Sequence, residues 1–271
     1  MSLQKSDKKI SIPTLLRMKE NREPIAMLTA YDTLMAGILD QSGIDIILVG
    51  DSGGMVMAGH ENTLAVTMDE MLHYVRSVRR AVKHAFLVAD MPFLSYQIST
   101  EDAIRNAGRF LQEGGAEAVK IEGGQPVLPI IERLVQFGIP VMGHLGLTPQ
   151  SIHQLGGYQV QGKNSQAAKR LKREAQLLQE AGVFSIVLEK VPSLLAKEIS
   201  EQLKIPTIGI GAGKYCDGQV LVSHDMLGLY EKFKPKFVRR YAELGKAMSE
   251  AFKQYISDVK QRNFPSDDES Y

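Results

Sequence analysis

The chain has 271 residues, 44% of them apolar, which suffices for one large core and is a normal size for a single (β/α)₈ barrel. Its formal net charge of +1 gives no electrostatic basis for binding nucleic acid, and its single cysteine, Cys216, excludes an internal disulfide and a zinc site made of several thiolates. The polar N-terminal stretch and the lack of an apolar run of membrane-spanning length predict a cytoplasmic protein without a membrane partner.

One pattern recurs along the chain: an amphipathic stretch ends at a glycine, and a short apolar, β-branched run follows. It occurs at residues 41–50, 113–124, 136–146 and 180–192. A glycine just past a helix takes the left-handed conformation that other residues avoid, and runs that are apolar on both faces are typical of buried parallel strands. The expected strands are, in chain order, 25–30, 45–50, 86–90, 118–122, 140–144, 185–189, 207–211 and 220–223.

Strands that alternate with helices imply a parallel sheet. Eight strands favour closure into an α/β fold of the (β/α)₈ TIM barrel type, although an open, doubly wound sheet has the same local pattern. An extra N-terminal helix is predicted at 12–19 and a long C-terminal helix at 236–260. No linker or low-complexity block interrupts the chain, so we expect one domain over 1–271, with a disordered polar tail at 264–271.

In parallel barrels, functional residues gather where the strands end. Three consecutive expected strands end in or next to an acid: Asp51, Asp90 and Glu122. Neighbouring strands are about 5 Å apart, so these carboxylates should converge and require a cation. Oxygen ligands favour Mg²⁺. The plainer alternative is that each acid caps the following helix or pairs with a lysine or arginine.

Two basic side chains occupy comparable positions. Lys120 lies two residues before Glu122, so both side chains face the same side of one strand. Lys120 is then a partner for these acids, a cation for a substrate carboxylate, or a Schiff-base amine; the nearby acids should keep it protonated, which favours the binding role. His144 ends the fifth strand and is either a core histidine or a functional one.

The sixth strand ends in Glu189. This glutamate either pairs with Lys190 and caps the next helix, or acts as a general base opposite a metal-bound ketoacid. The glycine-rich run at 208–214 matches neither the P-loop nor the dinucleotide fingerprint, because Tyr215 and Lys214 stand where these motifs need serine or threonine and glycine.

Seven segments follow one another along the chain in the order in which a known family has them: VGDSGGMVMAGH, ADMPF, VKIEGG, GHLGLTPQS, GGYQVQGK, VLEKVP and IGIGAG. Together they resemble the ketopantoate hydroxymethyltransferase family over residues 12–235, most of the chain. The resemblance implies a (β/α)₈ barrel that transfers a hydroxymethyl group from 5,10-methylenetetrahydrofolate to 3-methyl-2-oxobutanoate. It further implies a magnesium-stabilised enolate, 2-dehydropantoate as the product, a place in pantothenate and coenzyme A biosynthesis, and a homodecamer.

The resemblance also implies roles for individual residues. Those matching the magnesium ligands are Asp51, Asp90 and Glu122, and those matching the ketoacid-binding residues are Asp51, Ser52, Asp90 and Lys120. The catalytic proton acceptor matches Glu189, and we expect His144 to bind the substrate through the new hydroxyl. Many members carry cysteine after that glutamate, whereas this chain has Lys190.

Two other functions fit parts of the pattern. A magnesium-dependent C–C lyase of the phosphoenolpyruvate/isocitrate lyase superfamily resembles this fold, but such lyases often place a catalytic cysteine in a short loop where this chain has none. A ketoacid-binding protein without activity would be expected to lose at least one acidic strand end, and all four acids are present.

Overall fold

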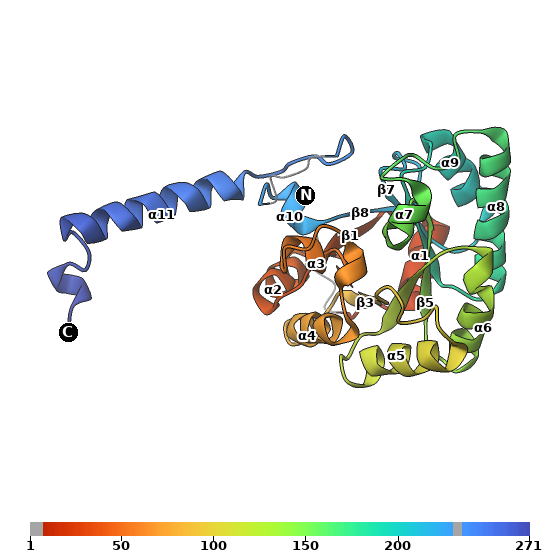
Figure 1. Cartoon of the computed structure of the whole chain (residues 1–271), viewed down its shortest axis with the longest axis horizontal. Helices are drawn as coiled ribbons and strands as arrows, with labels where there is room; N and C mark the ends of the chain where they lie inside the picture. The colour runs from red at the N-terminus through yellow and green to blue at the C-terminus, as the bar shows by residue number, and fades with distance from the viewer. Residues whose placement is uncertain (1–7, 230–234) are drawn as a thin grey trace. The chain divides into compact units, whose positions relative to one another are not determined.

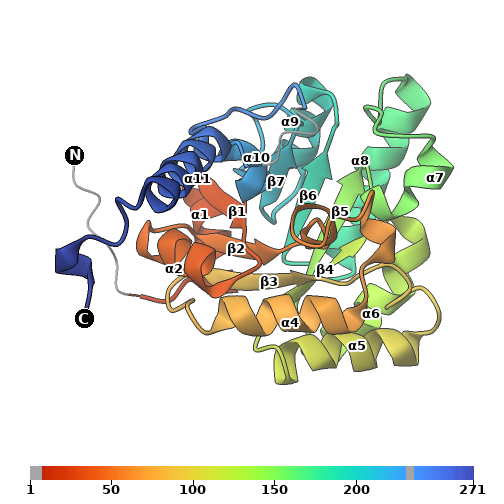
Figure 2. The same cartoon turned by 60° about the vertical axis from the view of Figure 1, so that its left-hand side comes forward.

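The strands form a closed parallel barrel. The computed structural model describes residues 8–229 and 235–271, and the chain divides into two compact units, Met1–Val222 and Ser223–Tyr271. The strands of the first unit pair in the order β1-β2-β3-β4-β5-β6-β7-β8, and β8 closes on β1. The predicted barrel is confirmed, and the open sheet is wrong. Figures 1 and 2 show the helices of this unit lying outside the strands.

The barrel strands are β1 (Ile25–Thr29), β2 (Ile46–Val49), β3 (Phe86–Asp90), β4 (Ala118–Glu122), β5 (Val141–Gly146), β6 (Ser185–Glu189), β7 (Thr207–Ile210) and β8 (Gly218–Leu221). The α-helices of the first unit are α1 (Ile12–Asn21), α2 (Thr33–Gln41), α3 (Gly53–Val56), α4 (Met68–Arg79), α5 (Thr100–Gln112), α6 (Leu128–Gln136), α7 (Ile152–Leu155), α8 (Ser165–Glu180) and α9 (Ser193–Gln202). Three short 3-10 helices accompany them: η1 (Thr63–Ala65), η2 (Gln125–Val127) and η3 (Pro149–Ser151).

The glycines that follow the helices behave as the recurring pattern predicts. Gly43, Gly115, Gly138 and Gly182 have φ angles of 85°, 74°, 79° and 94°. A side chain in this left-handed region is strained, so glycine lets the chain leave the helix and enter the next strand at once. These four glycines therefore mark where α2, α5, α6 and α8 end.

Side chains alternate between two apolar layers. Ile46 and Leu48 of β2 belong to a cluster that fills the barrel interior, whereas Ile47 and Val49 belong to the cluster between the strands and the surrounding helices. Leu15 of α1 is 1% exposed and belongs to the interior cluster. The extra N-terminal helix therefore contributes to the barrel core.

The second unit contains α10 (Ser223–Met226), α11 (Leu244–Gln261) and η4 (Asp267–Glu269). The long helix was predicted from residue 236, and this start is wrong. The Tyr241 N–H donates to the Met226 carbonyl, 2.8 Å away, and the Leu244 N–H donates to the Leu227 carbonyl, 2.9 Å away, so this stretch pairs with the end of α10. The predicted disorder at 264–271 stays a prediction.

A row of exposed apolar side chains runs along α11, spaced three or four residues apart: Leu244, Met248, Phe252, Tyr255 and Val259. No residue of this helix is buried. None of the helices in the described part of the chain combines the length and the apolar character needed to cross a membrane.

A buried carboxylate that the sequence did not predict joins α2 to the start of β3. Asp40 is 4% exposed and accepts hydrogen bonds from the backbone N–H groups of Lys83, His84 and Ala85 at 3.1, 2.9 and 2.8 Å. Its Oδ2 also lies 3.0 Å from His84 Nδ1. Burial raises the pKa of Asp40, but the hydrogen bonds outweigh burial, and the pKa is lowered below its ordinary value.

We expect Asp40→Asn to lower the free energy of unfolding by about 1–3 kcal/mol at pH 7, because one oxygen that accepts N–H bonds becomes a donor. An acid with a lowered pKa stabilises the fold above the pKa of the unfolded chain, about 3.9. This contribution is lost as the pH falls through the lower pKa of the folded state. Urea unfolding of both proteins from pH 3 to 7 measures the difference, with Asp69→Asn on an exposed carboxylate as the control. A pH-independent gap would contradict the assignment.

Candidate active site

The polar strand ends lie in one layer of the barrel interior, above the apolar layer. Val88 and Met142 belong to the interior apolar cluster, and Asp90 and His144 follow each of them by two residues on the same strands. Because alternate residues of a strand face the same side, Asp90 and His144 also point into the barrel. Glu189 follows the interior residue of β6 in the same way. The barrel is therefore apolar at one level and ionic at the next.

An ion-pair network links five of the predicted site residues. Asp90 is in register with Lys120, and Glu122 is in register with His144. Lys120 Nζ lies 2.8 Å from Asp90 Oδ1 and 3.9 Å from Glu122 Oε1. His144 lies between two acids: its Nδ1 is 3.3 Å from Glu122 Oε1 and its Nε2 is 3.3 Å from Glu189 Oε2. The network thus runs without a break from β3 to β6.

Asp51 joins this network through its backbone. Its N–H donates to Asp90 Oδ2 at 3.0 Å, and its side chain is 4% exposed. Ser52, the remaining predicted site residue, follows it in the chain, and the Ser52 hydroxyl lies 2.8 Å from the Tyr31 hydroxyl. All seven predicted residues are therefore at the same end of the barrel, although the Ser52 side chain bonds away from the ionic network.

Burial and mutual repulsion act on the acids. Burial raises the pKa of Asp51 well above its ordinary value, and the negative charges of Asp90 and Glu122 raise it further. Burial also raises the pKa of Asp90, although the ammonium of Lys120 acts in the opposite direction. The carboxylates at this end of the barrel therefore outnumber its two basic groups, Lys120 and His144, and their mutual repulsion is only partly compensated.

The acids of the network raise the pKa of both basic groups. Burial and the charge of Lys120 lower the pKa of His144, but Glu122 and Glu189 outweigh them and raise this pKa to about 9. Burial likewise lowers the pKa of Lys120, and the surrounding acids raise it above its ordinary value. His144 Nδ1 also lies 3.2 Å from Lys120 Nζ, so the imidazole ring stands between that ammonium and the carboxylates of Glu122 and Glu189.

The backbone around Glu189 is held from both sides. The Leu147 N–H donates to the Glu189 carbonyl at 2.8 Å, and the Lys190 N–H donates to the Ile210 carbonyl at 2.9 Å. Gly146, in register with Glu189, has a φ of 93°, and a Cβ there would collide with the Glu189 carbonyl oxygen. A glycine is therefore required at this point for the β5 and β6 ends to approach each other.

Residues 9–267 match the family model described as ketopantoate hydroxymethyltransferase. The chain belongs to the ketopantoate hydroxymethyltransferase family. Two relatives, both named 3-methyl-2-oxobutanoate hydroxymethyltransferase, can be aligned with this chain along their whole length. One, from Syntrophus aciditrophicus (strain SB), is 55% identical over 271 residues and covers 100% of both chains. The other, from Christiangramia forsetii (strain DSM 17595 / CGMCC 1.15422 / KT0803), is 55% identical over 272 residues with the same coverage.

Solved structures of other proteins share the barrel. A 2,3-dimethylmalate lyase of the PEP mutase/isocitrate lyase superfamily matches with a TM-score of 0.61 at 17% identity, covering 96% of this chain and 91% of the lyase. A phosphonopyruvate hydrolase in complex with oxalate and Mg²⁺ matches with a TM-score of 0.61 at 12% identity, covering 96% and 93%. Likeness at this identity shows the fold alone, whereas the ketopantoate hydroxymethyltransferase relatives confirm the predicted enzyme class.

Sequence reasoning missed the residues that brace the network in this hydroxymethyltransferase. Gln150, after β5, donates from Nε2 to Asp51 Oδ2 at 2.9 Å, and its backbone N–H donates to Glu122 Oε2 at 3.0 Å. The Tyr96 hydroxyl donates to Gln150 Oε1 at 2.8 Å. Both side chains are buried. Gln150 lies inside the segment GHLGLTPQS, and membership of this motif was the sequence signal that could have identified it. The position of Gln150 in the motif does not, however, predict which strand ends its side chain contacts.

The donor set fits a hard divalent cation. Asp51 and Asp90 are buried oxygen donors in an environment with excess negative charge, and Asp51 forms no ion pair within residues 8–229 and 235–271. In this part of the chain, no three His, Cys, Asp or Glu side chains are arranged to hold a metal ion by themselves. Mg²⁺ commonly uses one or two carboxylates together with waters and substrate oxygens. The predicted ligand set of Asp51, Asp90 and Glu122 thus stays a prediction.

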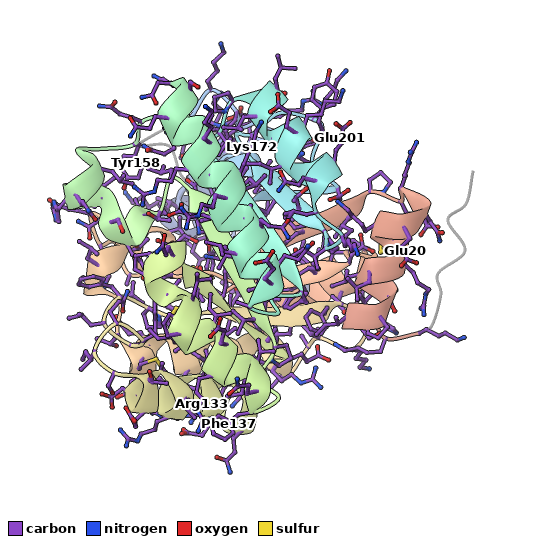
Figure 3. The ribbon with its side chains drawn as sticks, turned by 90° about the vertical axis from the view of Figure 1, so that its right-hand side faces the viewer. Glu20, Arg133, Phe137, Tyr158, Lys172 and Glu201 are labelled. Atoms are coloured by element: carbon purple, nitrogen blue, oxygen red, sulfur yellow. The ribbon has the colours of Figure 1, made fainter. Side chains whose placement is uncertain are left out.

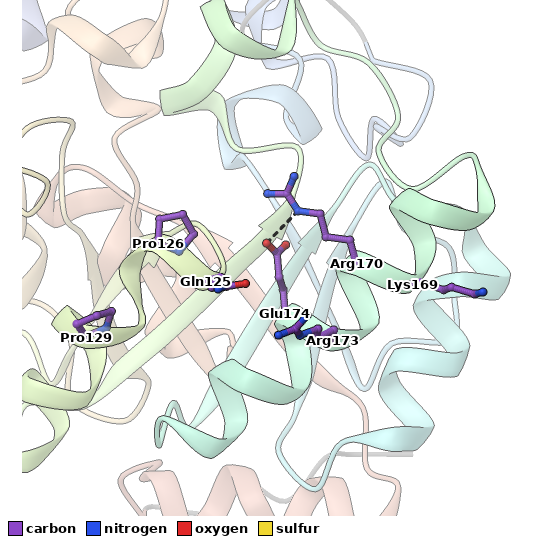
Figure 4. A pocket seen from close by; sticks show the side chains of 7 residues that line it. All are labelled: Gln125, Pro126, Pro129, Lys169, Arg170, Arg173 and Glu174. Carbon is purple, nitrogen blue, oxygen red and sulfur yellow. Dashed lines mark hydrogen bonds and ion pairs between the residues drawn. The ribbon is translucent and has the colours of Figure 1, made fainter.

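A cavity of about 790 Å³ lies away from the ionic network, in the outer layer between the η2–α6 segment and α8. Figure 3 shows this side of the ribbon, with Lys172 of α8 and Glu201 of α9 on its surface, and Figure 4 shows the cavity. Arg170 Nε lies 3.0 Å from the buried Glu174 Oε1, and a Cβ on Gly124 would collide with Glu174. The first contact lies within α8, and the close approach of Glu174 to Gly124 packs α8 against the segment that follows β4. The lining residues are Gln125, Pro126, Pro129, Lys169, Arg170, Arg173 and Glu174.

Proposed function

We propose that the protein transfers the one-carbon unit of 5,10-methylenetetrahydrofolate to 3-methyl-2-oxobutanoate and thereby forms 2-dehydropantoate. The observation that carries this proposal is the position of Glu189. It stands at the end of a buried ionic network, 3.3 Å from His144, and three more carboxylates lie at the ends of β2, β3 and β4 of the same barrel. The names of the full-length relatives supply the ketoacid and the transferred group.

The ketoacid would bind between the acids and Lys120. Asp51 and Asp90 would hold a Mg²⁺ ion, with Glu122 as the third carboxylate, and the ion would polarise the substrate carbonyl as a Lewis acid when bound. Lys120 neutralises charge on the substrate oxygens, and Ser52 contributes a hydroxyl beside Asp51. Lys120 is 5% exposed, so little water surrounds its ammonium. Its attraction to a substrate oxygen is therefore stronger than that of a lysine at the surface.

Glu189 acts as the general base. Its carboxylate takes the proton from the tertiary carbon next to the carbonyl, and His144 keeps that carboxylate oriented toward the substrate. The resulting enolate carbon forms a C–C bond with the methylene carbon of the donor, whose two C–N bonds break, and water supplies the hydroxyl group. The two released donor nitrogens take up the proton held by Glu189 and the remaining proton of that water. His144 then donates a hydrogen bond to the new hydroxyl group.

The proposal extends to the setting of the reaction. Its product serves pantothenate and coenzyme A biosynthesis in the cytoplasm, and copies of the chain associate into a homodecamer. The row of exposed apolar side chains along α11 supports association, because isolated surfaces rarely leave so many large apolar residues in line.

One assay tests the proposed reaction. The purified protein is mixed with 3-methyl-2-oxobutanoate, 5,10-methylenetetrahydrofolate and Mg²⁺, and 2-dehydropantoate is measured by mass spectrometry. We expect product only when all three are present, and loss of activity with a chelator that excess Mg²⁺ restores. Cleavage of a 2-methylisocitrate-type substrate without folate, together with no 2-dehydropantoate, would instead establish a lyase.

A further inference from the structure

The residue after Glu189 has an unusual backbone. Lys190 has a φ of 47°, in the left-handed region that side chains other than glycine rarely adopt. In this conformation the Lys190 N–H bonds to the Ile210 carbonyl, while the Lys190 carbonyl accepts from the Gln161 N–H at 2.8 Å. The chain therefore turns sharply just past Glu189, and the turn directs the backbone of Lys190 toward residues 156–162, named here the Tyr158 loop.

The side chain of Lys190 holds the same loop. Its Nζ donates to the Tyr158 carbonyl at 2.8 Å and lies 5.5 Å from the centre of the Tyr158 ring. The loop contains Gly156, Gly157 and Gly162, all with positive φ. Glycines leave the backbone free to take many paths, so the two bonds to Lys190 determine which path the loop follows.

The Tyr158 loop presents aromatic and apolar surface beside the base. Tyr158 is 42% exposed and Val160 is 39% exposed. Figure 3 labels Tyr158 at the edge of the view, on the loop that leads into α8. An exposed aromatic ring with a cation against it suits a ligand that combines a planar aromatic system with negative charge, because stacking and electrostatic attraction then act together.

We propose that the Tyr158 loop forms the binding wall for the folate donor and that Lys190 is a positioning residue that fixes this wall next to Glu189. The inference rests on the proposed function and adds the donor subsite to it. Folates carry a heteroaromatic ring, an aminobenzoyl ring and glutamate carboxylates, which match the chemistry that the loop displays. Lys190 acts through the loop and takes no part in proton transfer.

The test separates donor binding from proton abstraction. Lys190→Met keeps most of the stem and removes the ammonium, Tyr158→Ala removes the ring, and Tyr158→Phe keeps it. Lys204→Met, on an exposed lysine in the α9–β7 connection, is the matched control. For each protein, calorimetry gives the Kd of 5-formyltetrahydrofolate, and proton NMR follows deuterium exchange at the tertiary carbon of 3-methyl-2-oxobutanoate without any folate. A steady-state assay of 2-dehydropantoate gives the donor KM and the overall rate.

We expect Lys190→Met and Tyr158→Ala to weaken folate binding and raise the donor KM by about tenfold, while exchange stays within about twofold of the wild type. Tyr158→Phe and Lys204→Met should match the wild type in every readout. The proposal is overturned if neither Lys190→Met nor Tyr158→Ala changes the folate Kd, if exchange falls in parallel with the overall rate, or if the wild type binds no folate. These outcomes are distinct from a failure of the proposed function. In that case the wild type would form no 2-dehydropantoate, even if the folate Kd changed in the loop variants.

Discussion

Exchanging Glu189 for glutamine should abolish deuterium exchange at the tertiary carbon of 3-methyl-2-oxobutanoate and leave binding of the ketoacid intact. An amide cannot accept the proton, and removal of a general base slows a reaction by about 10²–10⁴-fold. Glutamine has the size and shape of glutamate, and its polar end keeps the place of Glu189 Oε2, 3.3 Å from His144 Nε2, so the surroundings should be preserved. Proton NMR measures the exchange, and calorimetry in the presence of Mg²⁺ measures the binding.

The control is Glu201→Gln, which changes an exposed acid of α9 (Figure 3). It should exchange and bind as the wild type does. Exchange at the wild-type rate in Glu189→Gln would show that another group removes the proton. Loss of ketoacid binding in that variant would show that Glu189 holds the substrate.

Replacing Asp90 with alanine should eliminate binding of the ketoacid that depends on Mg²⁺. This carboxylate lies 2.8 Å from Lys120 Nζ and accepts the Asp51 N–H at 3.0 Å, so one change removes a proposed metal ligand and the partner of the substrate-binding cation. Truncating one partner of a buried, hydrogen-bonded charge pair in a binding site costs about 2–5 kcal/mol of binding free energy, so the affinity should fall by at least about 30-fold. Titration calorimetry with and without a chelator measures it.

Asp69→Ala removes an exposed carboxylate and is the control for Asp90→Ala. Thermal unfolding of both variants shows whether the barrel remains intact. If Asp90→Ala folds and binds the ketoacid with the wild-type affinity in Mg²⁺, Asp90 is not a ligand and the proposed arrangement of the site is incorrect.

The barrel was predictable from sequence because glycine turns and β-branched runs are local signals. The observed bounds of β3, β4 and β6 equal the predicted ones, and the ends of the other strands shift by one or two residues. The predicted start of α11 was wrong, since the residues before Leu244 carry a helical pattern, but Tyr241 bonds to the last residue of α10 instead. Here, pairing between segments outweighs local propensity.

The ionic network was predictable for a related reason. Register in a parallel barrel places Asp90 beside Lys120 and Glu122 beside His144, so each of these acids meets a basic side chain of the next strand. Gln150 and Tyr96 escaped prediction because they sit on loops, where periodicity says nothing about direction. The contact of Lys190 with Tyr158 likewise depends on the path of a loop with several glycines.

The barrel interior changes from apolar to ionic side chains within two residues along β3, β4, β5 and β6. Repacking Leu15, Met27 or Phe86 should therefore alter the melting temperature while leaving turnover nearly untouched, because these side chains sit at the level that carries no charge. The apolar level of the barrel is therefore a region in which thermal stability can be engineered independently of catalytic turnover.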